Sequence, residues 1–465
     1  MHMNTEPNIA KHWQGGMTRT KTARRFGLVG HPLGHSLSPL IHQRIMDTMG
    51  IAGEYQLYDI APHSLAKELP PLLHELDGFN CTIPFKQAIM PFLSKLAPSA
   101  SLYGAVNTVF NREGHNTDGQ GFAACNVEMS GRSVCITGAG GVSRVLAIEA
   151  ARAGATSIVI DARNTEQGNA LVRDVRATGY DAIRVADAAK QEDCFCQVLL
   201  NGTPVGMWPN TGGLAMASQR IHQAQVVFDT IYNPTATRMI LKAKSQGIPA
   251  GGGLQMLFEQ ALASQRIWNP DVDFHRAPRE LATILPGLAL NVLQNSPIKL
   301  LLTGFMGSGK THIGRRLANS MSGYLPFVDL DEIVEQRAGK SIPDIISSQG
   351  EASFRGLERQ CLLELVHAPG SAIIATGGGA LVQPGAAEVV HAAATLVIYL
   401  DVTLGAAMSR VGPNGGRPLL NSANALGLYQ ARLPLYQAIA DYTVQADGHP
   451  DQVVSSIKKA FAWDA

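Results

Sequence analysis

The sequence lacks a charge excess of either sign and any long apolar run. Its 38 Lys and Arg residues nearly balance 37 Asp and Glu residues, for a formal net charge of +1. That balance gives no bulk electrostatic reason to expect a nucleic acid or an anionic membrane as a partner. The best candidate for a membrane span, residues 281–293, is shorter than the roughly 18 apolar residues that a span needs, and it contains Pro286. Neither charge nor hydropathy therefore indicates a nucleic-acid or membrane partner.

Cysteine is also scarce, and the cysteines show no metal-ligand spacing. The six are Cys81, Cys125, Cys135, Cys194, Cys196 and Cys361. We interpret the CFC segment at residues 194–196 as part of a core strand rather than as a redox or zinc site. A reduced, cytoplasmic interior is the natural setting for such thiols.

The first residues are basic but contain no apolar region, which argues against a secretory signal. We expect residues 1–23 to form a disordered leader, and an organelle transit peptide is the alternative.

The most specific motif is GFMGSGKT, residues 304–311, which matches the phosphate-loop pattern G-x-x-x-x-G-K-[ST]. A short apolar run before it predicts a buried strand, and an amphipathic helix follows. In such a loop, glycines let backbone N–H groups turn toward phosphate oxygens. Lys310 is expected to reach the β- and γ-phosphates, and Thr311 to ligate Mg²⁺. The motif predicts a nucleoside triphosphate site that includes Gly304, Gly307, Ser308 and Gly309, and a glycine turn without a nucleotide is the alternative.

A second glycine-rich turn, GAGGVSR, lies between a predicted strand and an amphipathic helix that leads to another strand. Gly138 and Gly140 fill the first two glycine positions of the dinucleotide-binding fingerprint, and Ser143 stands at the third. The strands and helices around it alternate, which predicts an α/β fold. The cofactor-binding residues predicted in this turn are Gly138, Ala139, Gly140, Gly141, Ser143 and Arg144.

Four polar motifs follow predicted strands in the first part of the chain: HSLSP, NCTIPFK, AVNT and NTDG. Open α/β sheets place their ligands at such strand ends. Each motif alone has a structural explanation. Ser36 or Ser38 serves equally well as a helix cap, Asn107 as an Asx-turn residue, and Lys86 as a solvated charge.

The motifs resemble two enzyme families in order and spacing. Residues from about 24 to 270 resemble shikimate dehydrogenase. The motifs that carry this resemblance are HSLSP, NCTIPFK, AVNT, NTDG, GAGGVSR, DTIYNP and GLQMLFEQ. Residues from about 298 to 463 resemble shikimate kinase through GFMGSGKT, VDLDEIVEQRAGKSI, FRGLE, ATGGGAL, GGRPLLN and ARLPLYQ.

These resemblances imply an α/β substrate-binding domain, a Rossmann domain and a P-loop domain like that of nucleoside monophosphate kinases. The substrate-binding domain is expected at residues 24–125, with 253–270 returning to it, and the Rossmann domain at 126–252. Residues 271–296 are expected to form a terminal helix, broken at Pro286, and a linker. The P-loop domain is expected at 297–465.

The first resemblance implies NADPH-dependent reduction of 3-dehydroshikimate to shikimate. Hydride transfer to a ketone makes an alkoxide that needs a proton, and Lys86 held by Asp118 would polarise the oxygen and relay that proton. The resemblance also implies a substrate pocket and one more cofactor-binding glycine, Gly253. The pocket residues would be Ser36, Ser38, Thr82, Asn107, Tyr232 and Gln260.

The evidence on the choice between NADP and NAD is divided. NADP-using members of the family usually carry N-R-T after the second Rossmann strand, whereas this chain reads DARNT, with Ala162 in place of Asn and Arg163 retained. Asp161 lies 23 residues after Gly138, close to where an acid binds the ribose 2′-hydroxyl of NAD. The guanidinium of Arg163 favours a 2′-phosphate. We predict NADP, with NAD as the alternative.

The second resemblance implies ATP-dependent phosphorylation of shikimate to shikimate 3-phosphate. Asp329 would serve Mg²⁺ through water, Asp331 would hold the acceptor hydroxyl, and Arg417 would lie in a lid over the phosphates. A helix N-terminal acid is the alternative explanation of Asp331. The other residues implied at this site are Arg355 and Arg432 on the substrate carboxylate, Gly377, Gly378 and Gly379 near the ring, and Arg410 at the nucleotide.

Both reactions address the same C3 oxygen, so the product of the first site is the substrate of the second. We therefore expect a bifunctional enzyme of chorismate and aromatic amino acid biosynthesis. A non-enzymatic sensor built from the same domains is the alternative, and such proteins usually lose catalytic residues. Here Lys86, Asp118, Lys310, Thr311 and Asp331 are all present.

Overall fold

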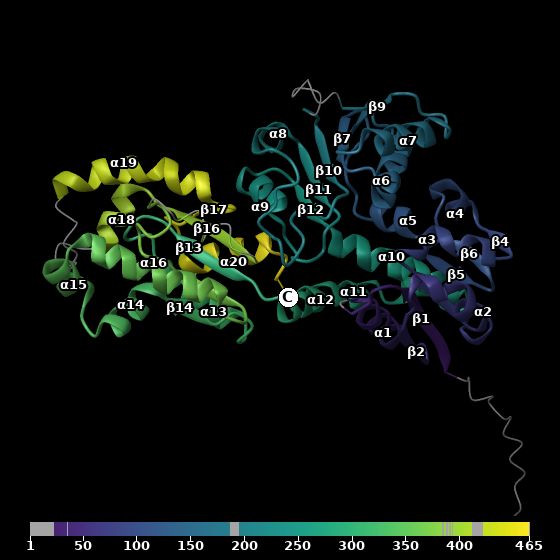
Figure 1. Ribbon diagram of the computed structural model, residues 1–465, viewed down its shortest axis with the longest axis horizontal. Helices are drawn as coiled ribbons and strands as arrows, with labels where there is room; N and C mark the ends of the chain where they lie inside the picture. The colour runs from purple at the N-terminus through teal and green to yellow at the C-terminus, as the bar shows by residue number, and fades with distance from the viewer. Residues whose placement is uncertain are drawn as a thin grey trace, which may run out of the picture.

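The computed structural model describes residues 23–34, 36–186, 195–383, 386, 389, 392, 394–411 and 422–464. These residues form three β-sheets covered by helices (Figure 1). The leader expected at residues 1–23 lies outside the described residues except for Ala23. In the described part of the chain, no helix is long and apolar enough to cross a membrane.

The first sheet has the strand order β2-β1-β3-β5-β6-β4. β1 is parallel to both of its neighbours, whereas β5 runs antiparallel to β3 and β6. The strands are β1 (Arg24–Gly30), β2 (Gly53–Asp59), β3 (Gly78–Cys81), β4 (Lys95–Leu96), β5 (Thr108–Phe110) and β6 (Glu113–His115). The helices are α1 (Ser38–Met49), η1 (Pro62–Ser64), α2 (Leu65–Glu75), α3 (Phe85–Ala88), η2 (Met90–Phe92), α4 (Pro98–Tyr103) and α5 (Asp118–Ala123).

The second sheet is parallel throughout, in the order β12-β11-β10-β7-β8-β9, as in a Rossmann fold. Its strand order reverses between β7 and β10, where such sheets bind ligands. The strands are β7 (Ser133–Thr137), β8 (Ser157–Asp161), β9 (Ile183–Val185), β10 (Val198–Asn201), β11 (Val226–Asp229) and β12 (Ala250–Gly252). The helices are α6 (Gly141–Arg152), α7 (Thr165–Arg176), α8 (Ser218–Gln223), α9 (Arg238–Ser245) and α10 (Gly253–Trp268).

The interpretation of the CFC segment as part of a core strand is wrong for the two residues that the structure describes. Phe195 and Cys196 precede β10 and belong to no strand, and Phe195 is 37% exposed. Cys194 lies outside the described residues. The apolar run that begins at residue 198 forms the buried strand instead.

The third sheet is also parallel, in the order β14-β15-β13-β16-β17. Its central strand follows the apolar run before the phosphate loop and is buried at each residue. The strands are β13 (Lys299–Thr303), β14 (Phe327–Asp329), β15 (Ala372–Ala375), β16 (Thr395–Asp401) and β17 (Tyr442–Gln445). The helices are α13 (Lys310–Ser320), α14 (Leu330–Ala338), α15 (Ile342–Gln349), α16 (Glu351–His367), α18 (Leu404–Val411), α19 (Ser422–Ile439) and α20 (Pro450–Ala460).

Three short helices connect the second and third sheets: η4 (Phe274–Arg276), α11 (Pro278–Ala282) and α12 (Ile284–Asn295). The expectation that Pro286 breaks a helix is wrong, because the break falls at Thr283. Pro286 lies in the first turn of α12, where proline removes no intrahelical hydrogen bond. α12 contacts α1 and α10 and buries Leu288, so this segment is packed rather than extended.

The two halves of the chain meet where α9 packs against β17 (Figure 1). Nε of Arg238 lies 3.2 Å from Oδ1 of Asp441, and the two side chains are only 6% and 3% exposed. The other carboxylate oxygen of Asp441 accepts a hydrogen bond from the Val397 backbone N–H at 2.8 Å. A buried ion pair therefore joins the Rossmann sheet to the sheet of the phosphate loop.

Further polar contacts extend this junction along α9. Nζ of Lys242 donates to the carbonyl of Ala440 at 2.9 Å, and Oγ of Ser245 accepts from the Thr443 N–H at 2.9 Å. Apolar packing is continuous as well, since one cluster of buried residues extends from α1 through α9 and α12 to α20. The motifs alone did not predict this interface.

Replacing Arg238 by methionine should destabilise the whole chain, because Asp441 would stay buried without its cation. Breaking one partner of a buried pair costs about 3–5 kcal/mol. Chemical unfolding of Arg238→Met, followed by fluorescence, measures the loss. The matched control is Glu364→Gln, which breaks the exposed pair with Arg337 and should leave the midpoint nearly unchanged. Equal effects of the two variants would contradict the importance of the interface.

Candidate active sites

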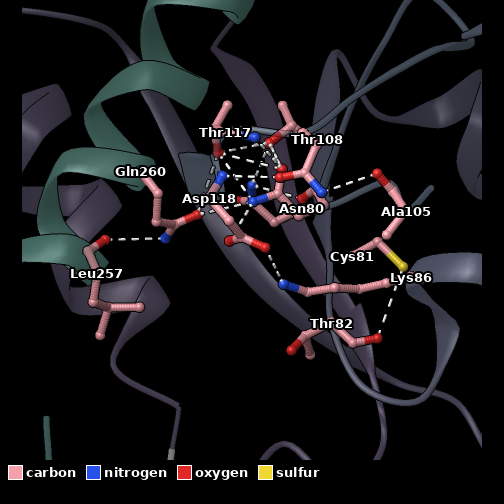
Figure 2. Close-up of polar contacts among 12 residues, drawn as sticks. Asn80, Cys81, Thr82, Lys86, Ala105, Thr108, Thr117, Asp118, Leu257 and Gln260 are labelled. Carbon is pink, nitrogen blue, oxygen red and sulfur yellow. Dashed lines mark hydrogen bonds and ion pairs between the residues drawn. The ribbon is translucent and has the colours of Figure 1, made fainter. Parts of the chain in front are cut away.

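The first candidate site is centred on an ion pair between Lys86 and Asp118 (Figure 2). Lys86 lies in α3, just after β3, and Asp118 is the first residue of α5. Nζ of Lys86 lies 2.6 Å from Oδ2 of Asp118, with the side chains 28% and 14% exposed. Nδ2 of Asn107 donates to the other oxygen, Oδ1, at 2.8 Å. Asp118 is thus held on both sides, and it presents the ammonium of Lys86 at a partly open position.

A buried polar network fixes Asn107 in turn. Oδ1 of Asn107 accepts from the Thr117 N–H at 2.8 Å and from Oγ1 of Thr108 at 2.9 Å. Oε1 of Gln260, on α10, lies 3.4 Å from Nδ2 of Asn107. The structure therefore brings together four of the predicted residues: Lys86, Asn107, Asp118 and Gln260.

Sequence reasoning missed the layer beneath this network. Nδ2 of the buried Asn80 donates to Oγ1 of Thr108 at 3.1 Å and to Oγ of Ser264 at 3.0 Å. Tyr55 donates to Oδ1 of Asn80 at 2.9 Å. One signal was available, because Gln260 and Ser264 are four residues apart and so share a face of α10.

The other predicted substrate residues lie in turns that follow strands of the first sheet and of the Rossmann sheet. Thr82 follows β3, beside the end of β1, so that a methyl group at Gly30 would lie 2.4 Å from its Cγ2. Oγ of Ser36 accepts from the backbone N–H of Ser38 at 3.2 Å, at the start of α1. Tyr232 follows β11 of the Rossmann sheet, and burial raises the pKa of its hydroxyl.

The dinucleotide turn connects β7 to α6. Gly138 has φ +98°, and its N–H donates to the carbonyl of Asp161 at 2.8 Å. Methyl groups at Gly140 or Gly141 would meet no atom within 4 Å, so the N-terminus of α6 is open where a phosphate would bind. The residues present therefore fit a dinucleotide. The side chain of Ser143 is buried and packs at Gly202, which follows the end of β10.

Gly253 has a steric role, because a methyl group there would lie 1.9 Å from the carbonyl oxygen of Thr230. Close approach of α10 to the end of β11 therefore requires glycine.

The basic and acidic residues around the turn have distinct partners. Arg144 pairs with Asp174 of α7 rather than standing free above the turn. Oδ2 of Asp161 accepts from Nη1 of Arg220, on α8, at 2.5 Å. Arg163 is exposed, and among the described residues it makes no ion pair.

The second candidate site is the phosphate loop between β13 and α13. Gly304, Gly307 and Gly309 have φ values of +147°, +79° and +87°, which favour glycine. Nζ of Lys310 donates to the carbonyl of Gly304 at 2.9 Å. The loop, including Ser308, lines a cavity of about 560 Å³. Arg410 of α18 lines the same cavity.

The loop carries a hydroxyl–carboxylate pair suited to Mg²⁺. Oγ1 of Thr311 donates to Oδ2 of Asp329 at 2.7 Å, and Oδ1 of Asp329 accepts from the Asp331 N–H at 3.1 Å. In the described part of the chain, no group of three or more His, Cys, Asp or Glu side chains is placed to hold a metal. The Thr311–Asp329 pair itself fits Mg²⁺, which is usually held by one or two protein oxygens together with phosphates and waters.

The predicted acceptor residues converge on the glycine loop after β15. A methyl group at Gly379 would lie 3.0 Å from Nη2 of Arg355 and 3.2 Å from Nη2 of Arg432. A methyl group at Gly377 would lie 3.2 Å from Oδ1 of Asp331. The carbonyl of the residue between them, Gly378, accepts a hydrogen bond from Arg432 at 3.2 Å.

Two residues that support this loop were missed in the sequence. Glu358 is buried, and it pairs with Nη1 of Arg355 at 2.7 Å. Burial raises the pKa of Glu358, while Arg355 opposes that shift. Tyr436 donates a hydrogen bond to the carbonyl of Gly378. Arg417, expected in a lid, lies outside the described residues, and Arg410 donates to the carbonyl of Ala446 at 2.8 Å.

A lysine–carboxylate pair near a dinucleotide turn, together with a phosphate loop on a separate parallel sheet, defines a fused enzyme of the oxidoreductase and phosphotransferase classes. Comparison with known proteins specifies the family of each half. Residues 28–109 match the family model of the shikimate dehydrogenase substrate binding domain, and residues 306–462 match that of shikimate kinase.

Among its relatives, the shikimate dehydrogenase (NADP(+)) of Caldanaerobacter subterraneus subsp. tengcongensis is 35% identical over 261 residues, covering 53% of this chain and 92% of that protein. The structure of a chorismate mutase/shikimate 5-dehydrogenase fusion protein from Clostridium acetobutylicum is 29% identical with a TM-score of 0.52, covering 58% of this chain and 98% of that chain. Shikimate 5-dehydrogenase from Listeria monocytogenes, in complex with shikimate and NAD, is 28% identical with a TM-score of 0.52, covering 58% and 100%.

The chain therefore belongs to the shikimate dehydrogenase family over its first half and carries a shikimate kinase domain in its second. The sequence prediction of both families is confirmed.

Near the first site, Asp229 should make stability depend on pH. Burial raises its pKa from 3.8 to about 6, although Thr237, Ile231 and Asn201 donate hydrogen bonds to it. The folded protein thus binds this proton more tightly than the unfolded chain. The stability that results is fully present below about pH 4 and is lost as the pH rises through about 6.

Urea unfolding of wild type and Asp229→Asn between about pH 4 and 7 measures this linkage. The free energy of unfolding of the wild type, relative to the variant, should fall by roughly 2 kcal/mol between pH 4 and 7, most of the total set by about 1.4 kcal/mol for each pKa unit. The exposed Asp181→Asn serves as the control and should track the wild type. The raised pKa of Asp229 would be contradicted if the difference in free energy of unfolding between wild type and Asp229→Asn did not change with pH.

Proposed function

We propose that this chain catalyses two successive reactions: reduction of 3-dehydroshikimate to shikimate with NADPH, and phosphorylation of shikimate by ATP at the 3-hydroxyl. The observation that carries the proposal is the presence of both reactive arrangements in one chain. Lys86 and Asp118 form a fixed pair 2.6 Å apart, and Thr311 bonds Asp329 beside a phosphate loop.

In the first reaction, NADPH supplies the hydride. Lys86 donates a hydrogen bond to the ketone oxygen of the substrate and provides the proton that the developing alkoxide needs. Asp118 orients the ammonium group of the lysine, and Asn107 keeps Asp118 in place. Ser36, Ser38, Thr82, Tyr232 and Gln260 are proposed to hold the carboxylate and ring hydroxyls of the substrate.

In the second reaction, Thr311 and, through water, Asp329 would hold Mg²⁺, which would neutralise charge on the phosphates of ATP. Lys310 binds the β- and γ-phosphate oxygens, a role that requires it to leave the loop carbonyls it now bonds. Asp331 accepts a hydrogen bond from the acceptor hydroxyl and orients it for attack. Arg355 and Arg432 bind the substrate carboxylate, for which the planar guanidinium is suited. Arg417 is proposed as the lid residue.

The domain limits remain part of the proposal. We assign residues 24–125 and 253–270 to the substrate-binding domain, 126–252 to the Rossmann domain and 297–465 to the kinase domain, in agreement with sheet membership. Residues 271–296 connect them. We propose a cytoplasmic location, since none of the described cysteines is in a disulfide bond. The names of the relatives support NADP, whereas the Listeria complex keeps NAD as the alternative.

Replacing Lys86 by alanine should abolish most dehydrogenase turnover without weakening cofactor binding. Loss of a positioned proton donor typically lowers kcat about 10²–10⁴-fold. Shikimate oxidation is followed by nicotinamide absorbance, and cofactor affinity by calorimetry. Lys95→Ala, which removes an exposed lysine paired with Glu113, is the matched control and should retain normal kcat. A Lys86→Ala enzyme with near-normal turnover would falsify the assignment.

Asp331→Asn should lower kinase kcat at least about 10²-fold while dehydrogenase activity is unchanged, because an amide is a poorer acceptor for the substrate proton. A coupled assay for ADP formation with shikimate as the acceptor measures the effect. Glu332→Gln changes the neighbouring exposed carboxylate, which pairs with Arg315, and should leave kcat within about threefold of wild type. The assignment fails if the two variants lose activity equally.

A further inference from the structure

The carboxylate of Asp161, at the end of β8, points toward α8 rather than standing alone at the cofactor site. Side chains alternate along a strand, and Val159 packs in the same apolar cluster as Ile221 of α8. Asp161 therefore projects on that face, where Nη1 of Arg220 donates to its Oδ2 at 2.5 Å. The pair is partly buried, with Arg220 20% and Asp161 35% exposed, so solvent screens it only in part.

This arrangement changes what Asp161 means for a bound dinucleotide. An unpaired carboxylate at the end of the second Rossmann strand accepts from a ribose 2′-hydroxyl and repels a 2′-phosphate. Here the guanidinium group of Arg220 offsets that charge. Arg163, two residues further along, is exposed and makes no ion pair with any described residue.

We propose that Arg220 is a specificity-determining residue: by neutralising Asp161, it lets the ribose subsite accept a 2′-phosphate that Arg163 then binds. The proposal deepens the proposed dehydrogenase function and rests on it for the identity of the dinucleotide. Arg220 acts through Asp161 and need not touch the cofactor. Asp161 paired with Arg220 should have little effect on the choice between NADP and NAD. Without Arg220, the carboxylate of Asp161 should disfavour NADP.

Calorimetric titration of the full-length chain with NADP⁺ and NAD⁺ tests the proposal without any substrate. Wild type should bind NADP⁺ more tightly. Arg220→Met should lower the NADP⁺ to NAD⁺ affinity ratio by about tenfold or more, the scale of one partly screened charge near a phosphate. Arg220→Lys keeps the positive charge and should retain the ratio within about threefold.

The double variant separates a charge effect from a structural one. In Arg220→Met/Asp161→Asn the repelling carboxylate is gone, so the affinity ratio should return close to that of wild type. If Arg220→Met fails to fold, Arg220→Gln, which keeps a hydrogen-bond donor to Asp161 but no charge, is used in its place. Arg132→Met is the matched control and should change neither affinity. It breaks the ion pair with Glu128 just before the start of β7, at the end of this strand away from the dinucleotide turn.

Equal weakening of both nucleotides in Arg220→Met, or no recovery in the double variant, would overturn the proposal and assign Arg220 a structural role. Preference of the wild type for NAD⁺ would overturn it as well. These outcomes are distinct from failure of the proposed function. Failure of that kind would appear as correct nucleotide discrimination without oxidation of shikimate.

Discussion

The buried ion pair between Arg238 and Asp441 sets how the two catalytic halves lie against each other. Two charges that are almost fully excluded from water must stay paired, because separating them leaves a desolvated carboxylate. α9 is therefore held on β17 in one orientation, and the neighbouring contacts of Lys242 and Ser245 follow from it. Each active site is built on its own sheet. The two halves are nevertheless packed against each other at this junction and are not joined by a linker alone.

Both sites are built on the same physical rule. Parallel strands end at one edge of a sheet, and side chains on the turns there converge without long loops. At the first site, α5 and the turn after β3 bring Asp118 and Lys86 together. At the second, β14 and the phosphate loop do the same for Asp329 and Thr311. The two proposed reactions at one substrate oxygen thus use the same arrangement twice: catalytic side chains on turns that follow strands ending at one edge of a sheet.

Much of this could be predicted from the sequence, because the strongest signals are local. The phosphate loop and the dinucleotide turn are contiguous motifs whose glycines are needed for positive φ or for close approach, as at Gly138 and Gly307. The alternation of strands and helices predicted α/β sheets. Pro286 was misread because a proline marks a helix start as readily as a break, and only the position of the preceding helix end distinguishes them.

What escaped prediction depends on residues far apart in the chain. Ser264 lies 184 residues from Asn80, and the partner of Asp161 lies 59 residues further on, with no pattern linking either pair. The sequence evidence on the cofactor was divided for this reason. Asp161 and Arg163 were weighed without Arg220, which pairs with Asp161 and which we propose sets the charge that the site presents.

One consequence of the junction concerns β17, which is the last strand of its sheet. An edge strand offers unpaired backbone groups to any other chain and is a common starting point for aggregation. Here the N–H of Thr443 is bonded by Ser245 of α9, and the helix covers the strand. Helix α9 of the dehydrogenase half thus covers the edge strand β17 of the kinase sheet. It blocks the addition of a strand from another molecule at this edge.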